Sequence, residues 1–302
     1  MFTYSIIIPH KNIPHLLKRC LDSIPSRKDI QTIIVDDNSD PTIVNFDKFP
    51  GYDKDNIEIY LTKEDKGAGY ARNIGLSKAK GKWILFADAD DFFNQNFLTE
   101  TDKYVDTDND LIYFLATSVY SDTLNKAFRN KYLLSTRKKY YKKLIKNEDE
   151  AKSELVYKNW EAWAKMFNRN FIEKNKLLFE EEKIGEDALF VIKAGELSRK
   201  YFVSDFPIYC ITYRNDSLCF KIISEDDFDQ NFLAKVRINK YLENVKKNSF
   251  KIDLTDDIIL SYRFGRKKMI NIYKIAKENG NKIRIKAILK YFLIKIKNNI
   301  LI

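Results

Sequence analysis

The sequence predicts an α/β fold with a doubly wound, mostly parallel sheet, followed by a helical extension. In the first hundred residues, apolar runs alternate with helix-like segments, a pattern typical of parallel sheets. Polar loops follow two of these runs, and residues 226–302 have helical spacing with no proline. With 302 residues, 44% of them hydrophobic and 32% charged, the chain is long enough to bury a full core.

The expected elements follow in chain order. The predicted first helix, Asn12–Ile24, can be capped by Asn12 and can accept Pro14 in its first turn. A glycine-rich loop, Lys66–Ala71, leads into a second helix, Arg72–Ala79. Six apolar, β-branched or aromatic runs read as strands: Tyr4–Pro9, Thr32–Val35, Ile57–Leu61, Trp83–Ala87, Leu111–Leu115 and Phe206–Tyr213.

Composition divides the chain near residue 220. The net charge is +10, but residues 231–302 hold 18 Lys or Arg against 5 Asp or Glu, whereas the first 230 hold 35 against 38. We therefore expect a domain at 1–220 and a basic helical region at 221–302. A basic nucleic-acid-binding protein is one alternative, but here the charge is confined to an Ile-rich tail, which fits lipid better than nucleic acid.

Several features predict a cytoplasmic protein. No apolar run approaches the ~18 residues of a membrane span, and MFTYSIIIPH reads as a strand and not as a signal peptide. The three cysteines, Cys20, Cys210 and Cys219, form no CxxC motif and indicate reduced thiols.

The most informative segment is KWILFADADD, where a buried-looking strand runs into Asp88, Asp90 and Asp91. Carboxylates repel one another, so the cluster calls for a cation, and strand ends of open sheets bind ligands. A divalent metal that also holds a phosphate would explain it. The alternative is an Asp-rich turn, in which Asp91 caps a helix beginning near Asn94.

Three further motifs carry candidate chemistry. Asp36 and Asp37 end the second strand, where a carboxylate can bind a base or ribose, although Asp36 can equally form a turn. GAGYARN, residues 67–73, can bring backbone close to a phosphate at a helix start. Glu186 and Asp187 can cap a helix, or one of them can act as a general base, and their spacing does not distinguish these two roles.

Together these motifs resemble family 2 glycosyltransferases. The resemblance rests on SIIIPHKN, TIIVDDNS, GAGYARNIGLSKAKGKWILFADADD, a Trp-rich segment ending in GEDALF, and YRNDS, in this order over roughly residues 3–217. It implies a GT-A fold with a Rossmann-like sheet, in which 1–100 forms a nucleotide-sugar half and 101–220 an acceptor half. His10 and Lys11 depart from the family pattern, and residues 116–158 match nothing in it.

The resemblance also implies roles for single residues. Pro9 belongs to a nucleotide-facing turn, Asp37 contacts the base of a UDP-type donor, and Arg72 lies near the donor. Asp90 ligates Mn²⁺ or Mg²⁺, with Asp88 on the ribose and metal waters, and Asp187 is the base of an inverting transfer. Candidate contacts of the acceptor or diphosphate are Trp160, Glu186 and Arg214.

The implied partners are a nucleotide-sugar donor and a glycan or lipid-linked acceptor used in bacterial surface polysaccharide synthesis. A sugar nucleotidyltransferase is the competing enzyme class, but it usually has a Gly-rich, basic signature at the first strand, which SIIIPHKN lacks. Trp160 and Trp163 can stack on a sugar ring, although their size favours a place in the core.

The basic tail predicts an amphipathic helix. Five apolar residues share one helical face, namely Ile285, Ile288, Leu289, Phe292 and Ile296. Lys282, Lys286, Lys290 and Lys297 lie around it. Such a helix can lie in the headgroup region at the inner face of an anionic membrane, or can pack on the protein with a solvated basic side.

Overall fold

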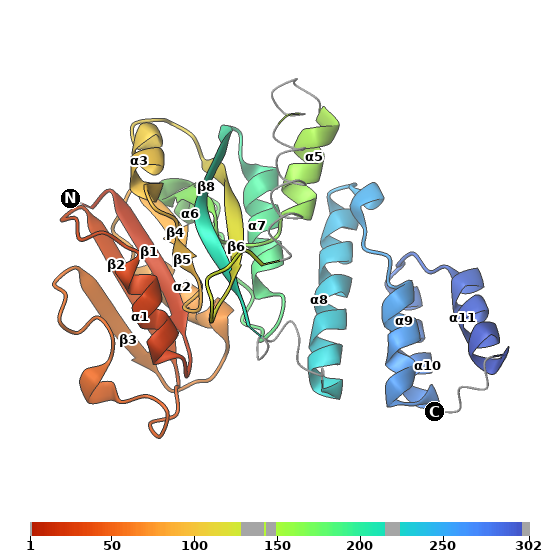
Figure 1. Cartoon of the computed structure of the whole chain (residues 1–302). Coiled ribbons are helices and arrows are strands. Elements are labelled where there is room, and N and C mark those ends of the chain that lie inside the picture. Colours follow the sequence, from red (N-terminus) through yellow and green to blue (C-terminus); the bar gives the residue numbers. More distant parts are fainter. Residues whose placement is uncertain (1, 128–141, 143–148, 215–223, 298–302) are drawn as a thin grey trace. The chain divides into compact units, whose positions relative to one another are not determined.

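The computed structural model describes residues 2–127, 142, 149–214 and 224–297 (Figure 1). The chain forms two compact units, Met1–Lys221 and Ile222–Ile302. The domain boundary predicted at residue 220, the last three residues of the YRNDS motif and the last residues of the tail lie outside the described residues. None of the described helices combines the length and apolar character that a membrane span needs.

Within the described residues, the first unit contains one eight-stranded mixed sheet in the order β3-β2-β1-β4-β7-β6-β8-β5. β1, β2, β3 and β4 pair in parallel, as do β6 and β8, while β7 and β5 run antiparallel to their neighbours. The strands are β1 (Tyr4–His10), β2 (Ile30–Asp37), β3 (Ile57–Thr62), β4 (Trp83–Phe86), β5 (Phe92–Phe93), β6 (Leu111–Tyr120), β7 (Lys165–Asn168) and β8 (Tyr201–Tyr213).

All six predicted strands are present, so the expected mostly parallel α/β sheet is confirmed. β5 and β7 were not predicted, because two and four residues are too few to show a hydrophobic period. The sheet is continuous across residues 1–100 and 101–220, and the carboxyl ends of β1, β2 and β4 share one edge.

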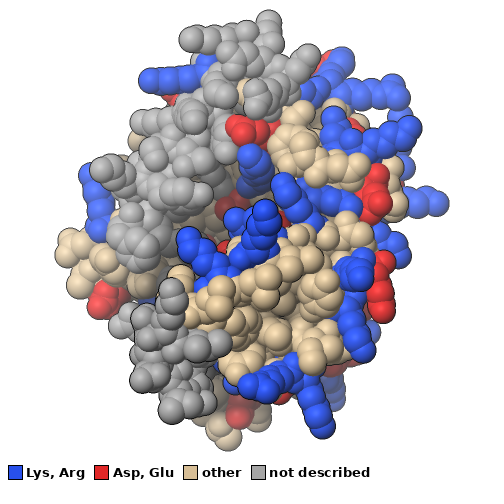
Figure 2. Space-filling model, turned by 90° about the vertical axis from the view of Figure 1, so that its right-hand side faces the viewer, with Lys and Arg blue, Asp and Glu red and all other residues tan. Residues whose placement is uncertain are grey.

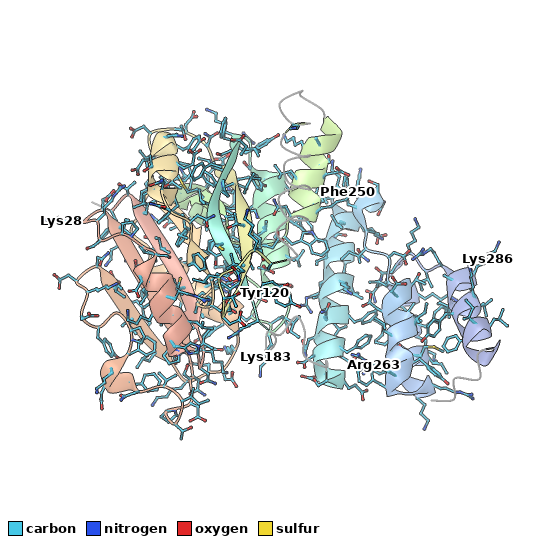
Figure 3. All side chains as sticks on the ribbon, viewed as in Figure 1. Lys28, Tyr120, Lys183, Phe250, Arg263 and Lys286 are labelled. Carbon is cyan, nitrogen blue, oxygen red and sulfur yellow. The ribbon has the colours of Figure 1, made fainter. Side chains whose placement is uncertain are left out.

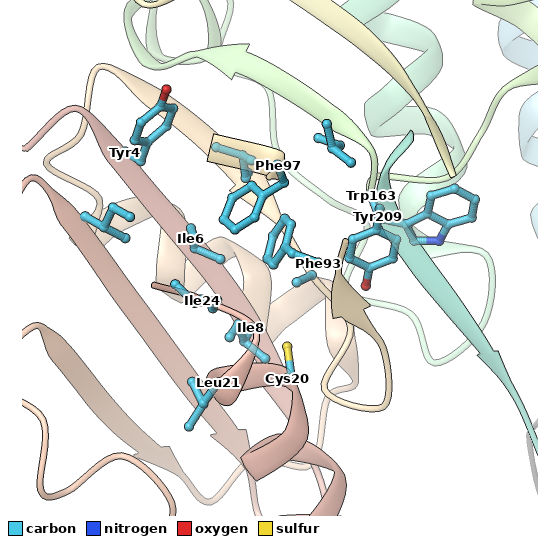
Figure 4. Close-up of a cluster of buried hydrophobic side chains, with 14 of the residues drawn as sticks. Tyr4, Ile6, Ile8, Cys20, Leu21, Ile24, Phe93, Phe97, Trp163 and Tyr209 are labelled. Atoms are coloured by element: carbon cyan, nitrogen blue, oxygen red, sulfur yellow. The ribbon is translucent and has the colours of Figure 1, made fainter. Parts of the chain in front are cut away.

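Helices cover both faces of the sheet (Figure 1). Side chains alternate along β1, so Tyr4, Ile6 and Ile8 enter one core cluster and Ile7 enters the other. The first cluster takes side chains from α1 (Pro14–Asp22) and α3 (Phe97–Thr101); Figure 4 shows part of it. The second takes them from α2 (Ala68–Lys78), α5 (Asp149–Lys158), α6 (Arg169–Lys174) and α7 (Glu186–Leu197).

Two helix starts differ from prediction. Asn12 does not cap α1: Ile13 is the N-cap, and the Asn12 Oδ1 instead accepts a hydrogen bond from the Asp40 N–H at 2.7 Å. Pro14 does stand in the first turn. α2 begins at Ala68, four residues earlier than expected, so most of GAGYARN is helical. Short 3₁₀ turns occur at Phe46–Lys48 and Asp102–Tyr104.

The second unit is helical over its described residues, as predicted. Its helices are α8 (Glu225–Asn244), α9 (Thr255–Ser261), α10 (Arg266–Glu278) and α11 (Ile285–Lys297), with 3₁₀ turns at Asn248–Phe250 and Tyr262–Phe264. Ser224 and Asp227 form a reciprocal capping box that begins α8. The unit has its own apolar core, which includes Phe228, Phe232 and Ile258.

Candidate active site

The acidic loop, which contains Asp88, Asp90 and Asp91, lies at the carboxyl end of β4, as predicted. The Asp88 N–H donates to the Tyr209 hydroxyl at 2.8 Å, and the Asp91 N–H donates to the Asp88 carbonyl at 3.0 Å, which closes a tight turn. The Asp88 and Asp90 side chains retain 34% and 25% exposure, whereas Asp91 is buried. Two of the three acids are therefore accessible to a ligand.

Asp91 does not begin a helix, so that interpretation is wrong. It directly precedes β5, and its Oδ1 accepts the Thr212 N–H of β8 at 2.7 Å. Burial, followed by the charges of Asp90 and Asp88, raises the pKa of Asp91 well above its usual range. This residue fixes the loop to the sheet and takes no solvent-facing position.

Arg19 of α1 supports the same loop and was missed by sequence reasoning. Its Nη2 donates to the Asp90 carbonyl at 2.7 Å, and its Nη1 donates to the Ser121 carbonyl at 2.9 Å. The Thr212 hydroxyl donates to the same Asp90 carbonyl at 2.6 Å. Nothing in the local sequence marks Arg19, because its partners come from segments far along the chain.

Arg72 joins two acidic motifs that are distant in sequence. From α2, its Nη2 donates to Asp88 Oδ1 and its Nη1 donates to Glu186 Oε1, both at 2.7 Å. The Arg72 side chain is only 5% exposed, and its guanidinium lies 5.3 Å from the Phe179 ring centroid. Burial alone would lower the pKa of Arg72, but the neighbouring carboxylates raise it, so the residue is a permanent cation. Its two terminal nitrogens are engaged by protein carboxylates, which favours a positioning role over the predicted donor contact.

The other residues of GAGYARN dock the chain before α7 onto α2. Asn73 exchanges two hydrogen bonds with the backbone of Phe179, at 2.9 and 3.0 Å. A Cβ on Gly69 would overlap the Glu180 carbonyl oxygen, and Gly67, at φ +92°, lies against Glu182. These glycines permit protein to approach protein, so the structure uses them differently from the predicted phosphate loop.

Asp37 holds the start of α2. Its Oδ2 accepts the Gly67 N–H at 2.7 Å and its Oδ1 accepts the Lys66 N–H at 3.1 Å, so a protein carboxylate occupies this helix N-terminus. Asp37 is buried at the end of β2, at the sheet edge shared by the carboxyl ends of β1, β2 and β4.

Asp36, by contrast, forms the turn that sequence reasoning allowed. It accepts hydrogen bonds from the Ser39 N–H at 2.9 Å and the Ser39 hydroxyl at 2.6 Å, and its Oδ2 lies 2.7 Å from His10 Nδ1. Pro9 is buried inside β1, and the turn predicted around it begins only after His10.

Glu186 and Asp187 occupy the first turn of α7, after Gly185 in a left-handed conformation. Burial, then the charge of Glu186, raises the pKa of Asp187 to about 7; Asp88 adds to the rise and Arg72 opposes it. Asp187 remains partly exposed at the surface. A carboxylate with this pKa can accept a proton near neutral pH, which suits a general base.

The remaining candidates lie in different environments. Arg214 Nη2 lies 3.2 Å from Asp90 Oδ2, so this residue does reach the acidic loop. The indole N–H of Trp160 donates to the Tyr157 carbonyl at 2.6 Å, and its ring is partly exposed. Trp163 is buried and stacks on Tyr209, with ring centroids 5.6 Å apart (Figure 4), so it belongs to the core.

A metal would need ligands beyond the protein. Within the described ranges, no group of three or more His, Cys, Asp or Glu side chains could hold an ion. Asp88 and Asp90 can offer carboxylate oxygens, and burial together with the charge of Asp88 raises the pKa of Asp90. Two carboxylates completed by phosphate oxygens and water form the all-oxygen set that Mg²⁺ and Mn²⁺ take.

Comparison with known proteins shows what the chain is similar to. Residues 5–167 match the family model described as Glycosyl transferase family 2. Glycosyltransferase GlyA of Streptococcus pneumoniae is 27% identical over 223 residues, which cover 71% of this chain and 31% of that protein. The poly(ribitol-phosphate) beta-N-acetylglucosaminyltransferase TarS of Staphylococcus aureus is 24% identical over 82% of this chain and 43% of TarS. The chain thus spans about a third to two fifths of these curated relatives' length.

Solved structures share the fold. The crystal structure of S. aureus TarS 1–349 has a TM-score of 0.59 and 21% identity, covering 88% of this chain and 73% of that chain. Mannosyltransferase PcManGT from Pyrobaculum calidifontis, in complex with GDP-Man and Mn²⁺, has a TM-score of 0.53 and 13% identity, covering 91% and 75%. The GT-A fold predicted from the sequence is therefore confirmed.

Proposed function

The chain belongs to glycosyl transferase family 2, and we propose that it transfers a sugar from a UDP-linked donor to a hydroxyl group with inversion at the anomeric carbon. The observation that carries the proposal is the network in which Arg72 joins Asp88 to Glu186, next to Asp187. It gathers donor-side acids and a base at one edge of the sheet, where open α/β sheets bind ligands.

The donor side is built from the acidic loop. Asp90 and Asp88 would hold Mg²⁺ or Mn²⁺, which supplies positive charge to the donor's two phosphates as the diphosphate departs. Arg214, 3.2 Å from Asp90, is the side chain proposed to contact the same phosphates. Asp37 keeps its proposed place beside the base, while its contacts to Lys66 and Gly67 set the loop that borders it.

The acceptor side is built from α7. Asp187 takes the proton of an acceptor hydroxyl, and the oxygen attacks the anomeric carbon from the face opposite the diphosphate. Burial raises the pKa of Asp187 to about 7, which makes this carboxylate a stronger base than a solvated aspartate while it stays ionised above that pH. Glu186 and Arg72 hold the first turn of α7. Trp160, which is partly exposed, remains a proposed contact of the acceptor.

The relatives indicate the substrate class. TarS carries the name of a poly(ribitol-phosphate) beta-N-acetylglucosaminyltransferase, and TarS 1–349 has been crystallised with UDP-GlcNAc. A similar protein of Bacillus spizizenii is named a poly(ribitol-phosphate) beta-glucosyltransferase. We propose a hydroxyl-rich acceptor of a bacterial surface polymer, a glycan or lipid-linked glycan, glycosylated on the cytoplasmic side of the membrane.

A panel of UDP-Glc, UDP-Gal, UDP-GlcNAc, UDP-GalNAc, GDP-Man and dTDP-Rha tests the proposal, with and without Mn²⁺. We expect one UDP-sugar to release UDP in a metal-dependent reaction. Release of pyrophosphate instead would indicate a nucleotidyltransferase. The proposed activity would be wrong if none of these donors were turned over and none of them raised the melting temperature of the protein.

A further inference from the structure

The exposed side of α11 carries an apolar stripe. Ile285, Leu289 and Leu293 stand four residues apart, on one side of the helix, and are 55%, 59% and 60% exposed. Ile294 and Tyr291 are also exposed, so α11 contributes five of the fifteen exposed large hydrophobic side chains among the described residues. Thirteen residues thus hold a third of them, a concentration that marks an interaction surface.

This stripe differs from the face predicted from the sequence. Ile288 packs against the apolar core of the second unit, and the Phe292 ring meets the Tyr262 ring edge-on with centroids 5.0 Å apart. The apolar face predicted for the tail helix is therefore divided into a packed part and an exposed part. Ile288 and Phe292 attach α11 to its own unit, while Ile285 and Leu289 remain outside, and the Ile296 side chain lies outside the described residues.

Basic side chains border the stripe. Lys286 and Lys290 directly follow Ile285 and Leu289, so they form the neighbouring row on the helix, and Lys282 precedes the helix; all three are exposed. The face drawn in Figure 2 shows Lys and Arg side chains around a tan area, and Figure 3 labels Lys286 on α11. Residues 279–302 contain no Asp or Glu.

We propose that this surface docks the protein on an anionic lipid membrane, with the stripe at the acyl boundary and the lysines among the headgroups. The charge argues for this occupant. A second copy docked through the same surface would bring two basic rows together, which is unfavourable. An interfacial helix, in contrast, needs an apolar side with adjacent Lys or Arg, and anionic headgroups attract those cations.

Sedimentation of the full chain with vesicles tests the surface. We expect binding to phosphatidylcholine vesicles that contain phosphatidylglycerol, and weak binding to phosphatidylcholine alone. The triple variant I285Q/L289Q/L293Q should bind about a thousandfold more weakly, since each apolar side chain contributes about tenfold when buried. The variant K282Q/K286Q/K290Q should lose about a hundredfold, at about fivefold per lysine.

Matched variants on the first unit serve as controls. I43Q/L124Q removes two apolar side chains that are each 53% exposed, and K28Q/K174Q/K176Q removes three exposed lysines. Both should bind vesicles as the wild type does. Urea unfolding midpoints should be unchanged in all four variants, because the substituted side chains are exposed.

Three results would overturn the proposal: no binding of the full chain to anionic vesicles, wild-type binding by the stripe variant, or equal loss in the controls. Self-association that disappears in the stripe variant, without vesicle binding, would assign the surface to a contact between copies. The vesicle assay contains no donor sugar, so its result does not depend on whether the protein transfers a sugar.

Discussion

Replacing Asp187 by asparagine should make the protein slower and more stable at the same time. Asparagine keeps the shape of the side chain but cannot accept the acceptor's proton, and a general base contributes about 10²–10⁴-fold to rate. We therefore expect turnover to fall at least about a hundredfold, while binding of UDP with Mn²⁺ survives.

The stability gain follows from the raised pKa. Because the pKa of Asp187 rises from 3.8 to about 7 in the folded protein, the native state holds a proton that the unfolded chain has already lost in this interval. The free energy of unfolding of the wild type therefore declines as the pH rises from about 4 to about 7, and the full loss is reached above that range. At about 1.4 kcal/mol per pH unit the ceiling is about 4 kcal/mol. Solvent reaches part of the side chain, so we expect Asp187→Asn to gain about 1–2 kcal/mol at pH 8.

Urea unfolding at pH 5 and pH 8, in EDTA and without donor, measures the gain, and UDP release measures turnover. The variant should exceed the wild type clearly at pH 8 and less at pH 5. Asp106→Asn, at an exposed loop position, is the control and should change neither quantity. Near-normal turnover in Asp187→Asn would refute the assignment of the base, and unchanged or lower stability at pH 8 would refute the electrostatic argument.

Four further predictions concern the network around this base. Turnover should fall about tenfold per pH unit below about 7, where Asp187 becomes protonated, and a flat pH–rate profile would contradict this. Arg72→Gln should destabilise the protein by about 3 kcal/mol in urea unfolding, because Asp88 and Glu186 lose their buried cation. Arg72→Lys should not restore turnover, because one ammonium group cannot contact both carboxylates at once. Asp90→Ala should abolish Mn²⁺-dependent UDP binding in calorimetry; unchanged affinity would exclude it as a ligand. Gly69→Ala should cost about 1–3 kcal/mol and lower turnover, since the added methyl overlaps the Glu180 carbonyl; wild-type stability would show that the segment shifts freely.

Much of the sheet could be predicted because each main strand carries its own apolar run. The strands Tyr4–Pro9 and Trp83–Ala87 can be predicted from their own residues alone, since a buried parallel strand is apolar on both faces. The two residues of β5 are not, because they form a strand only through their pairing with β8. Asp91 was misread for the same reason: its partner, the Thr212 N–H, lies far along the chain.

The local sequence singled out individual residues of the candidate site but not how they are arranged. Asp88, Arg72 and Glu186 were each singled out by a local motif, and in the structure Arg72 contacts both Asp88 and Glu186. The family resemblance implied that Arg72 lies near the donor, but the local sequence could not reveal that two carboxylates contact its terminal nitrogens. Arg19 carried no signal at all, because an arginine in an amphipathic helix is usually a solvated side chain.

These contacts make the motifs one electrostatic unit. Asp187 interacts with the charges of Glu186, Asp88 and Glu161, and Arg72 opposes them. Arg72 contacts both Asp88 and the first turn of α7, and the charge of Asp88 raises the pKa of Asp187, so a change of charge at Asp88 would change the basicity of Asp187. Positive charge brought to Asp88 would lower the pKa of Asp187 and favour its ionised form. If Asp88 holds the metal and Asp187 is the base, as proposed, binding at Asp88 would thus favour ionised Asp187. Because Arg72 contacts both Asp88 and Glu186, we expect substitutions at these three residues to be non-additive.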